Sequence, residues 1–180
     1  MKDLTMHVDE VARQLTQDIA GDAAAHDGAY IRKVVQPALL GLMDGSVSTL
    51  APLFATAFAT HNAHTAFLVG AAAALGVGIS MGFAEAMSDT GEQTGRGHLF
   101  IRGTITGIMT LLGGMMHTSP FLIPTFAAAL PLAYVIVGIE LMAIAMVRNR
   151  YFGLSIWLST LQVIVGGGLV FLAGVLIGSS

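Results

Sequence analysis

Long apolar stretches, separated by short polar breaks, make up most of the chain after residue 33. The segment Val34–Ser88 has two charged side chains, Gly103–Val147 has one, and Tyr151–Ser180 has none. A helix that spans a bilayer needs about 20 apolar residues, so these stretches of roughly 55, 45 and 30 residues accommodate two, two and one spans. The pattern therefore predicts an all-α, polytopic membrane protein of five transmembrane helices.

The polar breaks between the apolar stretches place the boundaries of the five helices. The spans are expected at residues 35–60, 65–88, 101–118, 121–147 and 154–177. The third and fourth spans are expected to be joined by residues 116–120. Every connection is too short to be a domain, so residues 31–180 are predicted to form one five-helix transmembrane domain.

Positive charge is confined to alternate connections. The eight Lys and Arg residues fall within the first 33 residues, at 96–102 and at 148–150. Because positively charged loops stay in the cytoplasm, the N-terminus is predicted to be cytoplasmic and the C-terminus, after five spans, outside. The same pattern favours a bacterial inner (cytoplasmic) membrane.

Residues 1–30 differ in character and are predicted to form a short cytoplasmic amphipathic helical segment. Apolar residues recur there at three- and four-residue spacing among acids, and Gly28 is expected to end the helix. The polar face carries Asp18, Asp22 and His26 at successive four-residue intervals. Such a spacing could hold a hard or borderline cation, and the alternative is a solvated polar face.

The overall composition narrows the possible functions. Hydrophobic residues make up 54% of the chain and charged residues 11%, so the lipid bilayer is its main surroundings. The absence of cysteine excludes disulfides and thiolate metal sites. A net charge of -3 without a basic patch argues against nucleic-acid partners. No nucleophile–base pair, phosphate-binding glycine loop or nucleotide motif is visible, so an enzyme is not expected.

Acidic side chains inside the predicted spans point to a cation site. An ionised carboxylate in hydrocarbon costs roughly 2.5 to 3.5 kcal/mol on insertion scales, so such an acid is a functional candidate. Met81 and Glu85 share a helix face, and Asp44 could meet them across an antiparallel helix pair. The carboxylate oxygens suit Mg²⁺, Mn²⁺ or Fe²⁺, and the thioether shifts the preference toward borderline ions such as Fe²⁺. The carboxylates are expected to be protonated when no cation is bound. Metal binding would then displace protons.

Further ionisable residues are candidates for the same site or for its mouths. Glu140 lies at a similar expected depth, and its alternative role is an ion pair with Arg148. Asp89 and Glu92 could gather cations at the inner mouth or merely solvate the turn. His117, expected on the outer side, could help ion release or act as a hydrogen-bonded helix-end residue.

Small residues at four-residue spacing mark close-packing helix faces. These are Gly41 and Gly45, Gly70, Ala74, Gly78 and Gly82, and Gly103 and Gly107. The spacing leaves open whether the faces join helices within one chain or between subunits.

Two segments resemble signature motifs of the vacuolar iron transporter family, including the related membrane domain attached to ferritin-like domains in bacteria. Residues 41–50 read GLMDGSVSTL, which is similar to the family pattern G-L-N-D-G-x-V-[ST]-[ST]-L. Residues 80–88 read SMGFAEAMS, which is similar to S-M-A-x-G-E-[YF]-x-S. Met43 and Ala84 depart from the family pattern, and the acidic region that plant members carry between spans two and three is nearly absent.

The resemblance implies a homodimer that exports Fe²⁺ or Mn²⁺ from the cytoplasm in exchange for protons. It implies Asp44, Met81 and Glu85 as ligands of the transported metal, with no permanent cofactor. The N-terminal acids are a candidate substitute for the missing acidic region. The sequence does not rank Fe²⁺ against Mn²⁺ and gives no stoichiometry. The alternative function is a non-transporting metal-binding or dimerising membrane module.

Overall fold

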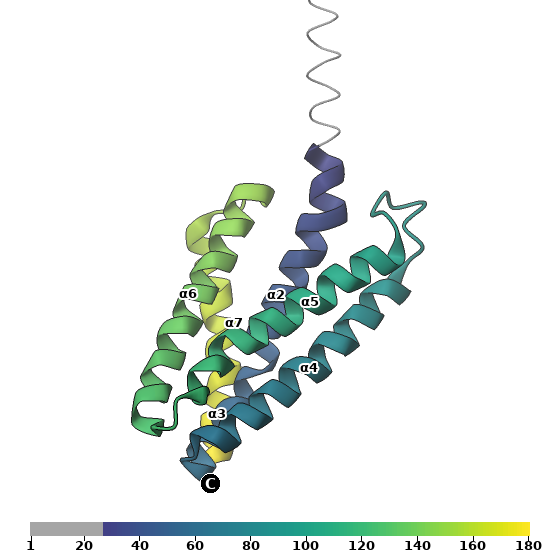
Figure 1. The fold of residues 1–180 in the computed structure, drawn as a ribbon. Helices are drawn as coiled ribbons and strands as arrows, with labels where there is room; N and C mark the ends of the chain where they lie inside the picture. The colour runs from purple at the N-terminus through teal and green to yellow at the C-terminus, as the bar shows by residue number, and fades with distance from the viewer. Residues whose placement is uncertain (1–26) are drawn as a thin grey trace, which may run out of the picture.

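The structure, a computed structural model, describes residues 27–180, so the predicted amphipathic segment with Asp18, Asp22 and His26 lies outside the described residues. Regular structure in the described part is helical throughout (Figure 1). The elements are the π-helical turn η1 (Ile31–Val35), α2 (Gln36–Ser48), α3 (Leu50–Thr60), α4 (Ala63–Ser88), α5 (Leu99–Thr118), the 3₁₀ turn η2 (Ser119–Leu122), α6 (Phe126–Phe152) and α7 (Ile156–Gly178).

Five helical stretches are long and apolar enough to cross a bilayer, which confirms the predicted span count. They are Asp27–Thr60, Ala63–Ser88, Leu99–Leu122, Phe126–Phe152 and Ile156–Gly178. The first is formed by η1, α2 and α3 in succession. The predicted helix end at Gly28 is wrong, because residues 27–30 are helical and lead directly into η1.

The connection between the third and fourth spans lies later than predicted. Residues 116–118 still belong to α5, and η2 follows at once, so the chain turns at residues 123–125. Pro120 was expected to mark the break. It instead occupies the first turn of η2, where its missing N–H costs no hydrogen bond.

The charged ends of the helices gather at one end of the bundle, which we call the basic end. There the first span begins, α4 joins α5, and α6 joins α7 (Figure 1, top). The described Lys and Arg residues at this end are Arg32, Lys33, Arg96, Arg102, Arg148 and Arg150. Gly153 ends α6 there with a φ of 63°, a left-handed conformation that favours glycine.

Helix α5 packs along both α2 and α4 and lies between them over much of its length (Figure 1). A Cβ atom at Gly41 or Gly45 of α2 would overlap the backbone of Thr106 or Thr110 in α5. The small-residue face of α2 therefore joins helices within one chain.

The small-residue face of α4 meets a neighbouring face of α5. A Cβ atom at Gly78 would lie 3.0 Å from the carbonyl oxygen of Gly107, and one at Gly82 would lie 3.0 Å from that of Gly103. Backbones can approach this closely only because both helices present glycine at the crossing. The open question of which helices the glycine stripes join is thus answered for these two faces.

An apolar core fills the end of the bundle opposite the basic end. Phe54 is fully buried there and stacks edge-on against Phe171, with ring centroids 4.9 Å apart. Phe121 contacts Phe54 in the same edge-on manner at 6.4 Å. These aromatic contacts hold α3, η2 and α7 together.

Candidate functional site

Asp44 is a partly buried carboxylate near the middle of the first span. It lies 17 residues after Asp27 and 16 before Thr60 in that 34-residue stretch. Its Oδ1 accepts a hydrogen bond from Ser48 Oγ at 2.8 Å. Asp44 forms no ion pair with a described residue. Asp44 is therefore an acid in an apolar span without a compensating cation in the chain that the structure describes.

Polar side chains accompany Asp44 on the outward face of α2. Gln36 and Ser48 lie eight residues before and four after it, share its face, and are exposed at the surface of the single chain. Leu40, between them, is 42% exposed. We call this face the Asp44 stripe. An ionised carboxylate that faces lipid is energetically costly. The Asp44 carboxylate is therefore expected to be neutralised, or the Asp44 stripe to be covered by another protein surface.

Met81 does not come together with Asp44 within one chain. Gly45, beside Asp44, packs against Thr110 of α5, whereas Gly82, beside Met81, packs against Gly103. These two α5 positions are seven residues apart, which is about 10 Å along the helix axis. The expectation that Asp44 meets Met81 and Glu85 across a direct antiparallel pair is wrong for the single chain, because α5 lies between α2 and α4.

Glu85 is buried and already paired. Its Oε1 accepts hydrogen bonds from Arg102 Nε at 2.7 Å and from Arg96 Nη2 at 2.6 Å. The same two arginines also bind Asp89, each at 3.0 Å. We call Glu85, Asp89, Arg96 and Arg102 the four-charge cluster. With two acids and two bases, it is neutral as a whole.

Arg102 is the centre of the four-charge cluster. Its side chain is 1% exposed, and it also donates to the carbonyl oxygen of Glu85 and to Ser88 Oγ, both at 3.0 Å. The cluster joins the end of α4 to the start of α5 and fixes the 89–98 connection between them. The charge pattern placed Arg102 in a connection, whereas it is buried inside α5.

The acids of the 89–98 connection do not form a separate cation site. Burial raises the pKa of Asp89, but hydrogen bonds from Arg102, Thr94, Arg96 and the backbone of Gly91 outweigh it, so its pKa lies below the ordinary value of 3.8. Glu92 is exposed and forms no ion pair with a described residue.

Glu140 lies deep in the bundle and pairs with histidine. It is 2% exposed, and its Oε2 lies 2.9 Å from Nδ1 of His117, which is fully buried. Glu140 is 14 residues from the start of α6 and 12 from its end, so it sits halfway along a span. The alternative role of His117 as a hydrogen-bonded helix-end residue is confirmed, because it lies in the last turn of α5 and contacts Glu140 and Thr49. The alternative pairing of Glu140 with Arg148 is wrong, since Arg148 donates to Gln162 at 2.9 Å.

A threonine extends the His117–Glu140 pair. Nε2 of His117 lies 2.7 Å from Oγ1 of Thr49, and that hydroxyl donates to the carbonyl oxygen of Gly45 at 2.8 Å. Oε1 of Glu140 is buried and has no partner among the described residues. Thr49 was not among the predicted site residues. The available signal was that Glu140 is the one charged residue of the apolar stretch Gly103–Val147, which also contains His117, so each needs a partner.

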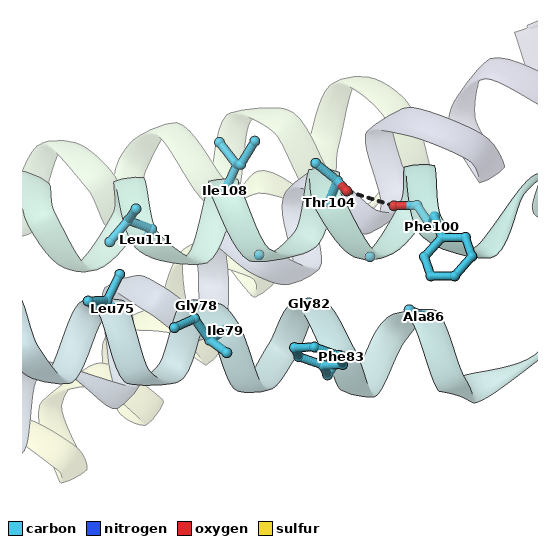
Figure 2. Close-up of a pocket in the computed structure, with 12 residues that line it drawn as sticks. Leu75, Gly78, Ile79, Gly82, Phe83, Ala86, Phe100, Thr104, Ile108 and Leu111 are labelled. Atoms are coloured by element: carbon cyan, nitrogen blue, oxygen red, sulfur yellow. Dashed lines mark hydrogen bonds between the residues drawn. The ribbon is translucent and has the colours of Figure 1, made fainter.

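Cavities lie between the described helices. One, of about 300 Å³, lies between α2, α6 and α7 and is lined by residues that include Met43, Val47, Ile144 and Arg148. Another, of about 410 Å³, is an apolar groove between α4 and α5 (Figure 2). Neither Asp44 nor Met81 lines the groove, so it is not the predicted cation site.

The described ionisable residues of one chain do not assemble a multidentate metal site. Among residues 27–180, no group of three or more His, Asp and Glu side chains could hold a metal ion. Comparisons with protein families, with characterised proteins and with solved structures find no match to this chain. The functional proposal therefore rests on the chain itself.

Proposed function

We propose that the protein transports Fe²⁺, Mn²⁺ or both out of the cytoplasm in exchange for protons. The observation that carries this proposal is Asp44, a carboxylate halfway through an apolar span without a cationic partner among the described residues. Proteins keep such a group for ion pathways and proton relays, because it is costly for anchoring alone. The motif resemblance around residues 41–50 and 80–88 supports the choice of ion.

In this proposal a second copy of the chain covers the Asp44 stripe. A two-fold axis beside α2 would bring the stripes of two chains face to face and remove their polar groups from lipid. Two Asp44 carboxylates and nearby side chains would then supply oxygen ligands that one chain lacks. The homodimer thus accounts for the incomplete site in the single chain.

The proposed metal ligands are Asp44 and Met81, contributed through the dimer. Glu85 reaches a metal only when the four-charge cluster opens, since both arginines bind its Oε1. Glu140 is not among the proposed ligands, because His117 binds its Oε2. The basic end faces the cytoplasm, following the rule that positive loops stay inside.

Metal uptake by inside-out proteoliposomes tests the proposal. Asp44→Asn keeps the size of the side chain and its acceptor for Ser48 but removes the charge. We expect it to abolish Mn²⁺ uptake. The matched control is Glu92→Gln, which neutralises an exposed acid and is expected to retain uptake.

Two outcomes would count against this account. Full uptake by Asp44→Asn would refute the assignment of Asp44. A wild-type protein that binds Mn²⁺ but moves neither Mn²⁺ nor Fe²⁺ would favour the alternative, a non-transporting metal-binding module.

A further inference from the structure

The His117–Glu140 pair is a buried ionisable pair, among the residues that the structure describes, that the proposed metal site does not use. His117 is 0% and Glu140 2% exposed, and they come from different spans, α5 and α6. Thr49 of the first span completes the contact. Three of the five spans therefore meet at one polar network within the bundle.

The hydrogen bond from Thr49 to Gly45 defines one arrangement of the protons in this network. A hydroxyl has one hydrogen, and Thr49 donates it to the carbonyl oxygen of Gly45 at 2.8 Å. In this arrangement the hydroxyl can only accept toward His117, so Nε2 of His117 carries a hydrogen. The contact of 2.9 Å between Nδ1 and Oε2 of Glu140 then requires one further proton between these two atoms.

We propose that the His117–Glu140 pair is an intramembrane proton-binding site that holds one exchangeable proton. With this proton the pair is neutral overall, either as imidazole and carboxylic acid or as imidazolium and carboxylate. When one proton leaves, the remaining ring hydrogen lies on Nδ1 and donates to the carboxylate. Nε2 is then bare, and Thr49 turns its hydroxyl hydrogen from Gly45 to Nε2. The network is satisfied in both states, and Thr49 is its switch.

The surroundings of the pair make the deprotonated state dependent on an incoming cation. Deprotonation leaves a net negative charge in a buried place, and Oε1 of Glu140 has no partner among the described residues. No described cation is close enough to form an ion pair with Glu140 other than His117 itself. A cation that approaches would therefore favour release of the proton.

Charged groups on the surrounding helices are engaged elsewhere. On α2, Asp44 is bonded to Ser48, and on α6, Arg148 is bonded to Gln162. On α4 and α5, Glu85 and Arg102 belong to the four-charge cluster. Helix α7 has no charged residue. None of these described groups therefore bonds to His117 or Glu140.

The cavity between α2, α6 and α7 offers a route from the basic end. It is lined by Arg148 and Gln162 near that end and by Ile144, which follows Glu140 by one helical turn. A cavity of about 300 Å³ is large enough for several water molecules, which could carry a proton toward the pair. The role of this site in metal–proton exchange rests on the proposed function. The presence of an exchangeable proton on the pair does not depend on that function.

Nitrogen NMR of histidine-labelled, full-length protein in lipid nanodiscs tests the proposal. The spectrum reports which ring nitrogen carries hydrogen, and His117→Gln assigns the signal. We expect wild-type His117 to carry hydrogen on Nε2 at neutral pH and to convert to the Nδ1–H form at alkaline pH. His64, exposed at the opposite end of the bundle, serves as the control histidine in the same spectrum.

Variants locate the exchangeable proton. Glu140→Gln cannot lose a proton, so we expect the signal of His117 to stay in the Nε2–H form at alkaline pH. Thr49→Val removes the hydrogen that stabilises bare Nε2, so conversion should move to higher pH or disappear. If a variant does not fold, the wild-type pH series still decides the question.

Some results would overturn the inference. These are a wild-type His117 already in the Nδ1–H form at neutral pH, or an alkaline conversion that persists in folded Glu140→Gln. A pair that behaves as expected in a protein without metal flux would leave the proton site standing and refute transport. Metal–proton exchange by a protein whose His117 signal never changes would support transport and refute the proton site.

Discussion

Replacing Arg102 by methionine tests whether the four-charge cluster holds the α4–α5 connection. Arg102 is 1% exposed and donates to Glu85, Asp89 and Ser88 at 2.7 to 3.0 Å. Methionine keeps much of the volume but leaves Glu85 with Arg96 as its one remaining cation in the cluster. Breaking a buried ion pair costs about 3 to 5 kcal/mol, and we expect the lower end of this range because Arg96 remains.

A double variant separates the lost charge pair from lost packing. Removing both charges, in Arg102→Met with Glu85→Gln, leaves no uncompensated carboxylate at the Glu85 position. We therefore expect the double variant to lose about 1 to 3 kcal/mol less than the sum of the two single variants.

Reversible unfolding in mixed micelles of SDS and a mild detergent measures these free energies. Trp157 is the single tryptophan of the chain and, at the start of α7, provides a fluorescence signal. The reasoning would be refuted if Arg102→Met unfolded at the same SDS fraction as the wild type. It would also fail if the two single effects simply added, because the partners would then not be coupled.

Two further predictions concern helix packing and pH. Gly45→Ala should lower the free energy of unfolding by about 1 to 3 kcal/mol, because its Cβ would overlap the backbone of Thr110. Gly138→Ala has no atom within 4 Å of its Cβ and should raise that free energy by about 0.5 to 1 kcal/mol. Equal effects of the two variants in SDS unfolding would contradict this. The lowered pKa of Asp89 contributes to folding stability above pH 3.8, and this contribution is lost as the pH falls further. The difference in unfolding free energy between wild type and Asp89→Asn should therefore shrink on acidification. A difference that is independent of pH would disprove this.

The spans were predictable from sequence because their signal is local. Apolar length and the absence of charge from Tyr151 to Ser180 are properties of single segments, and the glycine spacing of α2 and α4 marks a face on each helix. All of these features are confirmed in the structure. The helix end at Gly28 was wrong because residues 27–30 are helical, and the break at residues 116–120 was wrong because proline is compatible with the first turn of a helix.

The contacts between spans were not predictable in the same way. Periodicity shows which residues share a face but not which helix covers that face, so the position of α5 between α2 and α4 did not follow from the pattern. The pairing of Glu85 with Arg102 and of Glu140 with His117 depends on that position. A general rule still held, since both buried acids found a basic partner. Asp44 is the exception, and it carries the proposed function.

The most direct test of metal–proton exchange is Mn²⁺ accumulation in inside-out proteoliposomes with an acidic lumen. The account predicts that Mn²⁺ enters against its concentration gradient while protons leave the lumen, and that a protonophore abolishes the accumulation. Uptake that reaches the same level with and without the pH gradient, or no uptake at all, would contradict it.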